Sequence, residues 1–306
     1  MLKNSSWVEY QPALAQEFAL LTFLISLFIL LNNIVVLSIF LRVKKREVMD
    51  YLIISLAISD LLTLVPHALI TAVLISRSIW LTTNMCNFLG VLRIATIGST
   101  TWIHSALCIH KTFSIANPLA YPNHASGPTD SVKCVLCVVI IFCFLGPTLV
   151  CVTLLIEGSL LRIAFDVYEA SCTYVSDLRL YAALGSCFLV LPLIIQIITH
   201  GIILHKVQKM SSANHNRCMR TFRTIVATLA IFYVCRVPFF IFILWKNLPI
   251  NSKPPVWFEV IQRHAVTLNS ATSTVIYYKT LRKFRVLFKS TIVKLSSSQI
   301  HPESNS

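Results

Sequence analysis

Charged residues are scarce in this 306-residue sequence, and acidic residues are scarcer than basic ones. Asp, Glu, Lys and Arg make up 12% of the chain, with 12 acidic against 26 basic residues. Soluble proteins carry about 25% charged residues, whereas this chain is 56% hydrophobic and has a mean hydropathy of +0.75. A soluble protein built of buried helices would need polar helix faces, which most of its apolar segments lack. The composition therefore indicates an integral membrane protein.

The sequence also lacks the motifs of common enzymes. It contains no His-x-x-x-His zinc spacing, no glycine-rich phosphate-binding loop and no Gly-x-Ser-x-Gly nucleophile motif. His104 and His110 lie in one apolar segment, and we interpret them as packing or switch residues. We therefore expect a protein that is not an enzyme and that uses neither a cofactor nor a metal.

Seven long apolar runs fill most of the chain. Each is long enough to cross a bilayer as a helix, which takes roughly 20 mainly apolar residues. The runs lie at about 18–41, 50–76, 84–115, 131–156, 180–205, 219–245 and 255–278. We predict an all-α fold, a bundle of seven transmembrane helices. Its expected parts are an N-terminal segment (1–17), the membrane domain (18–279), an amphipathic helix (280–295) and a disordered tail (296–306).

Basic residues gather on one side of this predicted bundle. The loops after the first, third and fifth runs and the C-terminal tail hold 17 of the 26 Lys and Arg residues, and the opposite side holds seven. Because cytoplasmic loops are enriched in Lys and Arg, we expect the N-terminus outside and the C-terminus inside. This arrangement by membrane side argues against binding to nucleic acid. Asn4, in the sequon Asn4-Ser5-Ser6, is then a candidate glycosylation site.

Segment 280–295 combines an apolar stripe with basic residues. The stripe recurs at the helical spacings of 3, 4, 4 and 3, in Leu281, Phe284, Phe288, Ile292 and Leu295. Arg282, Arg285 and Lys289 lie off that stripe. We expect this helix to lie on the inner leaflet, where anionic membrane lipids attract its basic face.

Most of the ten cysteines lie within the apolar runs, where they behave as small apolar side chains. Cys86, at the outer end of the third run, and Cys172, in the loop between the fourth and fifth runs, are both expected on the oxidising side. A disulfide between them would hold that loop over the mouth of the bundle. The alternative is that both cysteines are unpaired.

Motifs along residues 20–288 resemble, in the same order, those of rhodopsin-like (class A) G-protein-coupled receptors. The matching segments are Asn32-Asn33-Ile34-Val35-Val36, Leu56-Ala57-Ile58-Ser59-Asp60, Asn117-Pro118-Leu119-Ala120-Tyr121, the prolines Pro147, Pro192 and Pro238, and Leu268-Asn269-Ser270 with Tyr277. Cys86 and Cys172 also match the outer disulfide that the family shares. The resemblance implies a plasma-membrane receptor that binds an extracellular small molecule or peptide and signals through a heterotrimeric G protein.

Three motifs that act as switches in the family are altered here. The family's Asp/Glu-Arg-Tyr, Cys-Trp-x-Pro and Asn-Pro-x-x-Tyr read His110-Lys111-Thr112, Cys235-Arg236-Val237-Pro238 and Ser273-Thr274-Val275-Ile276-Tyr277. The resemblance gives the G-protein coupling and switch roles to His110, Lys111, Thr112 and Tyr277. Two alternatives stay open: a divergent chemosensory receptor of the odorant type, and a receptor that is constitutively active or does not signal. A transporter or channel is disfavoured, because no inverted repeat or pair of broken helices is detectable.

Asp60 is expected near the middle of the bilayer, where a carboxylate is costly and marks a functional site. The resemblance surrounds it with oxygen-bearing groups of the kind that hold sodium in this family, namely those of Asn33, Thr100, Asn269, Ser270 and Ser273. Arg236 is expected roughly a turn or two above Asp60, where its charge could take the place of sodium. Two roles of Arg236 stay open: an internal salt bridge to Asp60, or direct contact with a ligand.

Arg93 lies 18 residues before Lys111, at the depth where amine receptors of this family carry a ligand-binding Asp. A positive charge there argues against a cationic amine. Glu259 and Arg263 are four residues apart and share a helix face, which the resemblance points at the cavity. Two arginines would favour an anionic, carboxylate-bearing ligand through bidentate hydrogen bonds. In the alternative, Glu259 pairs with Arg93 or Arg263 and closes the bundle.

Overall fold

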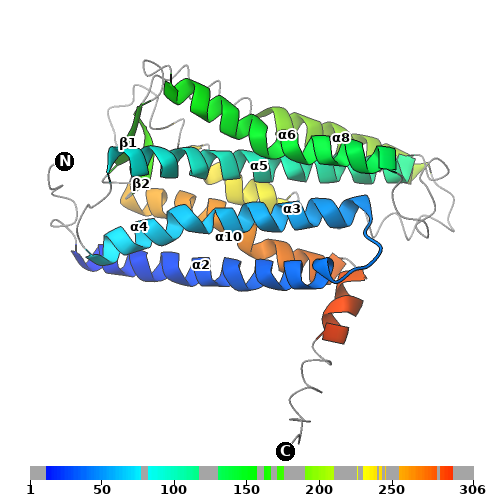
Figure 1. The fold of residues 1–306 in the computed structure, drawn as a ribbon, viewed down its shortest axis with the longest axis horizontal. Coiled ribbons are helices and arrows are strands. Elements are labelled where there is room, and N and C mark those ends of the chain that lie inside the picture. The colour runs from blue at the N-terminus through cyan, green and yellow to red at the C-terminus, as the bar shows by residue number, and fades with distance from the viewer. Residues whose placement is uncertain are drawn as a thin grey trace, which may run out of the picture.

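The protein folds as a bundle of long helices that lie side by side (Figure 1). The computed structural model describes residues 12–76, 82–116, 130–156, 162–166, 171–175, 190–209, 226, 230–239, 241–242, 245, 255–280 and 283–291. The helices are α2 (Pro12–Leu41), α3 (Val48–Leu62), α4 (Leu64–Ser76), α5 (Thr83–Ala116), α6 (Asp130–Ile156), α8 (Leu191–Gln208) and α10 (Val256–Thr280). Asn4 and the side chains of Glu259, Arg263 and Ser273 lie outside the described residues.

The helices have the length and apolar surface of membrane spans. Within the described residues, three segments are long and apolar enough to cross a membrane, and they are Ala19–Leu41, Val48–Leu69 and Val132–Val150. Leu191–Lys206 and Ala230–Phe239 form shorter apolar helices in the fifth and sixth predicted runs, which are described only in part. Large apolar side chains such as Leu20, Phe23 and Phe142 are more than half exposed, as expected for groups that face lipid.

The second predicted run is two helices, because α3 ends at Leu62 and α4 begins at Leu64. Proline has no N–H to donate, and its ring clashes with the carbonyl four residues earlier. Pro66 therefore disturbs the backbone at Leu62. Thr63 caps the break by donating its hydroxyl to the carbonyl of Asp60 at 2.5 Å. The interruption thus lies one turn from the buried carboxylate of Asp60.

One element was not expected from the sequence, a short antiparallel hairpin of β1 (Arg162–Asp166) and β2 (Ser171–Val175). Phe165 stands opposite Cys172 in its register. Cys172 forms a disulfide with Cys86 at the start of α5, with the two Cα atoms 5.2 Å apart. The predicted pairing is therefore confirmed. We call the end of the bundle that carries this hairpin the disulfide end, and α2 begins at the same end (Figure 1).

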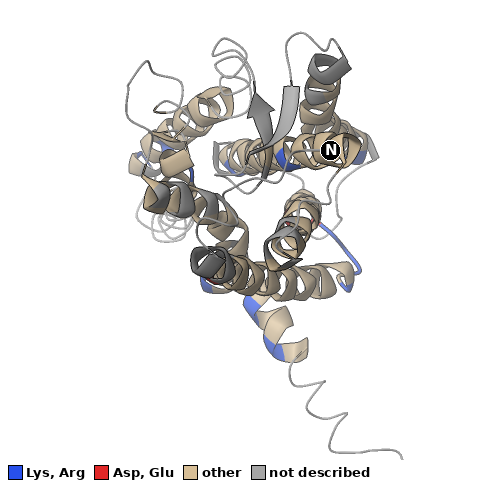
Figure 2. Ribbon diagram, turned by 90° about the vertical axis from the view of Figure 1, so that its left-hand side faces the viewer, with Lys and Arg blue, Asp and Glu red and all other residues tan. Residues whose placement is uncertain are grey.

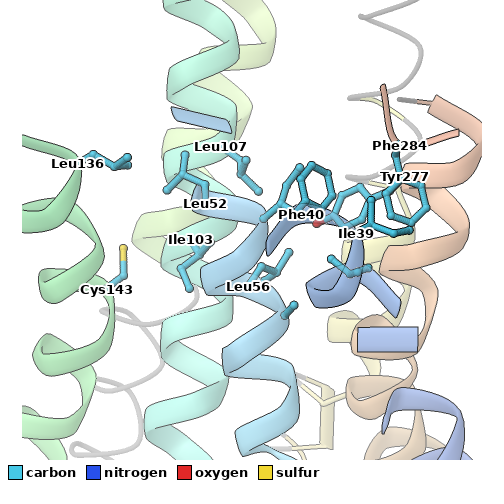
Figure 3. Close-up of a cluster of buried hydrophobic side chains, with 13 residues drawn as sticks. Ile39, Phe40, Leu52, Leu56, Ile103, Leu107, Leu136, Cys143, Tyr277 and Phe284 are labelled. Atoms are coloured by element: carbon cyan, nitrogen blue, oxygen red, sulfur yellow. The ribbon is translucent and has the colours of Figure 1, made fainter. Parts of the chain in front are cut away.

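The main apolar core joins α2, α3, α5, α6, α10 and a short helix after α10, towards the other end of the bundle. Figure 3 shows its labelled members, Ile39, Phe40, Leu52, Leu56, Ile103, Leu107, Leu136, Cys143, Tyr277 and Phe284. The rings of Phe40 and Phe284 stack with centroids 5.8 Å apart, and Tyr277 meets Phe284 edge-on at 6.3 Å. Lipid is as apolar as these side chains, so close packing and not exclusion of water holds the helices together.

A short helix over residues 283–291 follows α10, and Figure 2 shows it standing out from the bundle with Lys and Arg in blue. Its Lys283 Nζ lies 2.6 Å from Asp50 Oδ2 and 3.5 Å from Glu47 Oε1. Glu47 and Asp50 form the capping box at the start of α3. An ion pair and the Phe40–Phe284 stack therefore tie the short helix to α2 and α3.

Candidate functional site

A polar cavity lies among α4, α5, α10 and the described part of the sixth run. Its lining consists of Thr63, Pro66, His67, Arg93, Thr96, Ile97, Thr100, Arg236, Thr267 and Ser270. The volume open to the centre of a water molecule is about 30 Å³. The described lining carries two guanidinium groups, several hydroxyls and no carboxylate.

Asp60 lies beside this cavity and is fully buried. Ser270 donates its hydroxyl to Asp60 Oδ1 at 2.7 Å, whereas Oδ2 has no hydrogen-bond partner among the described residues. The neighbouring Ser59 shares a hydrogen bond of 3.1 Å with Thr100 and donates to the carbonyl of Thr96 at 3.3 Å. These bonds connect α3 with α5 and α10 around the carboxylate.

Arg236 is only 4% exposed, yet its Nε and Nη1 atoms have no hydrogen-bond partner in the described part of the chain. Its guanidinium lies 5.4 Å from the ring centroid of Phe232, which is a cation–π distance. It is close enough to Asp60 for their charges to interact, but these two described side chains form no direct ion pair. The charge of Arg236 thus acts near Asp60 as expected, without the salt bridge considered from the sequence.

Arg93 reaches the same cavity from α5, and its carbonyl accepts the hydroxyl of Thr96 at 3.0 Å. Glu259 and Arg263 belong to α10, but their side chains are outside the described residues, so the convergence of Arg93 with Arg263 stays a prediction. The fold instead brings Arg93 and Arg236 to one cavity, although they are 143 positions apart in the sequence.

The residues expected around Asp60 do not all surround its carboxylate in the same way. Asn33 donates to the carbonyl of Ile29 at 3.0 Å and to that of Ser270 at 3.5 Å, so it binds backbone on α2 and α10. Thr100 lines the cavity and Asn269 is buried on α10. Within the described residues no group of three or more His, Cys, Asp or Glu side chains could hold a metal ion.

His67 is a lining residue that the sequence reasoning missed. Its Nε2 lies 3.5 Å from the hydroxyl of Thr267, which connects α4 to α10 across the cavity wall. His67 follows Asp60 by seven residues, a spacing of two turns that would place both on one face of the uninterrupted helix expected from the sequence. That spacing was a signal that could have found it.

Thr112, one of the altered switch residues at the far end of α5, lies against α8. Thr112 donates its hydroxyl to the carbonyl of Cys108 at 2.8 Å and to that of Thr199 at 3.4 Å. Closer to the cavity, Ser105 donates to the carbonyl of Pro192 at 3.2 Å and accepts from Gln196 Nε2 at 3.0 Å. Hydrogen bonds at two levels therefore join α5 and α8.

Two further switch candidates, Lys111 and Tyr277, lie towards the same end of the bundle. Lys111 forms no ion pair with any described acid. Tyr277 is 9% exposed, and its hydroxyl is buried without a hydrogen-bond partner among the described residues. Its ring packs instead against Phe284.

Residues 32–277 match the family of the 7 transmembrane receptor (rhodopsin family). The chain belongs to this family, so it is a G-protein-coupled receptor in a membrane and not an enzyme. It is similar to the melatonin receptor type 1A of Ovis aries, with 27% identity over 298 residues that cover 92% of this chain and 78% of that protein. These findings confirm the resemblance and the seven-helix fold predicted from the sequence.

Proposed function

We propose that this receptor lies in the plasma membrane with its N-terminus outside the cell and senses an extracellular ligand that carries an anionic group. The single observation that carries the ligand class is the described lining of the cavity, with Arg93 and Arg236 and no carboxylate. Guanidinium groups recognise carboxylates through paired, charge-assisted hydrogen bonds. A cationic amine would meet repulsion from both side chains.

Two features support the orientation. Disulfides form on the oxidising side of the membrane, and the start of α2 lies at the disulfide end of the bundle (Figure 1). The short basic helix 283–291 extends from the other end, as the positive-inside rule expects for the cytoplasmic side. Asn4 would then be exposed to the glycosylation machinery, and the basic helix to anionic lipids of the inner leaflet.

In this proposal the ligand selects between two arrangements of α8 against α5. The hydrogen bonds at Ser105 and Thr112 connect the two helices from the level of Pro192 to that of Thr199. A ligand that interacts differently with the two arrangements shifts their populations. The shift would open the cytoplasmic end, with His110, Lys111, Thr112 and Tyr277, to the G protein.

A G-protein activation assay in cells tests the ligand class. The panel should contain small carboxylates, lipid carboxylates, amines and, because of the similarity to a melatonin receptor, melatonin. We expect carboxylates to activate the receptor and amines to be inactive. Activation by amines alone would contradict the proposal. Cells that express Arg93→Gln at the same surface level should respond less to carboxylates, and cells that express Arg42→Gln, at an exposed residue outside the described lining, are the matched control.

A further inference from the structure

Arg236 has hydrogen-bond donors that nothing in the described protein uses. A guanidinium stays charged in proteins and presents five N–H donors in a fixed fork. Buried donors normally find an acceptor, since an unmade hydrogen bond is costly away from water. Arg236 is 4% exposed and lines the cavity, yet Nε and Nη1 have no partner among the described residues. An acceptor that enters the cavity would satisfy them.

The size of the cavity restricts that acceptor. One water needs roughly 10–15 Å³ of this kind of volume, so about 30 Å³ holds about two waters or one compact ion. A whole drug-sized ligand needs a pocket of about 300–1,000 Å³. The occupant is therefore smaller than the extracellular ligand.

The charge of the wall restricts the acceptor further. Arg93 adds a second guanidinium to the described lining, whereas Asp60 is not part of the lining and accepts from Ser270. Thr96 directs its hydroxyl to the carbonyl of Arg93. A metal cation would meet two positive groups and few free oxygen ligands. A monovalent anion would instead receive the N–H groups of Arg236 and be attracted by Arg93.

We propose that this cavity is a halide site, which binds one chloride ion on the free donors of Arg236 with Arg93 beside it. This inference rests on the proposed function in one respect, because chloride without agonist and the anionic group of the ligand with agonist would meet the same two guanidinium groups, while the cavity is too small for the rest of the ligand. Chloride would fix α5 against the sixth helix and stabilise the bundle when no agonist is present.

Thermal denaturation of the full-length receptor in lipid nanodiscs tests the site. Sodium chloride replaces sodium gluconate at constant ionic strength, so the sodium concentration never changes. We expect the midpoint temperature to rise by several degrees and to saturate with chloride, to rise equally with bromide, and to stay unchanged with sulfate. A rise with formate but not with the halides would show a carboxylate site and overturn the proposal.

Substitutions then locate the effect. Arg236→Gln should abolish the response to chloride, and Arg93→Gln should raise the chloride concentration at half-effect at least threefold. Arg42→Gln, at an exposed residue of the α2–α3 loop, should respond like the unaltered receptor. An undiminished response in Arg236→Gln would contradict the site. If that variant does not fold, the anomalous signal of bromide in crystals of the unaltered receptor decides, and its absence from the cavity overturns the proposal.

Discussion

Ser270 Oγ donates a hydrogen bond of 2.7 Å to Asp60 Oδ1, and this bond joins α10 to α3 where both residues are buried. It is the one hydrogen bond that the structure records on this carboxylate among the described residues. Because Asp60 is fully shielded from water, the bond from Ser270 should contribute to the stability of the bundle near the cavity.

Ser270→Ala should therefore lower the stability of the bundle by about 1.5–3 kcal/mol, the range for hydrogen bonds to charged groups. The measurement is thermal denaturation of the purified receptor in nanodiscs. Ser290→Ala is the matched control, because Ser290 is exposed and bonds only to the carbonyl of Leu287 in its own helix. Equal midpoints for the two variants would show that the Ser270 bond contributes nothing.

The ion pair between Lys283 and Asp50 predicts a second difference in stability. Asp50 is fully buried, so Lys283→Ala leaves a buried carboxylate whose one remaining partner among the described residues is the backbone N–H of Glu47, at 2.8 Å. Lys283 is itself about one third exposed, which weakens the pair through solvent screening. We expect a loss of about 1–3 kcal/mol, whereas Lys289→Ala, at an exposed residue of the same helix, should cost less than about 0.5 kcal/mol.

A double-mutant cycle with Asp50→Asn assigns that loss to the pair. The coupling energy should account for most of the effect of Lys283→Ala, since the two side chains are in direct contact. Strict additivity of the two single substitutions would rule out the interaction as a source of stability.

The end of the bundle that carries Lys111 should be held only weakly in its resting arrangement. The family resemblance implies that acids beside the third span and near the start of the sixth hold the positive residue of the third span at rest. In this sequence His110 takes the place of the first acid and Cys218, 20 residues before Pro238, that of the second, and Lys111 pairs with no described acid. A charge-assisted pair contributes about 1–3 kcal/mol, which changes a two-state equilibrium by roughly 5- to 150-fold. We therefore expect high signalling without ligand. Lys111 lacks the planar fork of Arg, which should weaken coupling to the G protein and lower this signalling in part.

Restoring the acids tests this expectation. His110→Asp combined with Cys218→Glu should lower ligand-free second-messenger output at equal surface expression. His110→Asn with Cys218→Gln has similar shape without the charge and should leave that output high. If the receptor signals and the acidic double variant gives unchanged ligand-free output, then the missing acids do not set the basal activity.

The sequence predicted the helical bundle from the length of its apolar runs. It predicted the Cys86–Cys172 disulfide because both cysteines are expected on the oxidising side of the membrane. It did not predict the break at Thr63, although Pro66 was a visible signal for it. The Lys283–Asp50 pair joins residues 233 positions apart, and no local pattern identifies such partners. The relation of Arg236 to Asp60 likewise depends on where the sixth helix lies, so the absence of a direct ion pair required the structure.

The central claim is that guanidinium groups of this receptor recognise an anionic ligand. The most direct test is the affinity of a carboxylate agonist for the unaltered receptor and for Arg93→Gln, measured in one G-protein activation assay at equal surface expression. We predict a loss on the order of 2–5 kcal/mol, the scale for removing one partner of a buried charged pair, a similar loss for Arg263→Gln, and no loss for Arg42→Gln. A cationic agonist that is indifferent to both Arg93→Gln and Arg263→Gln would contradict the account.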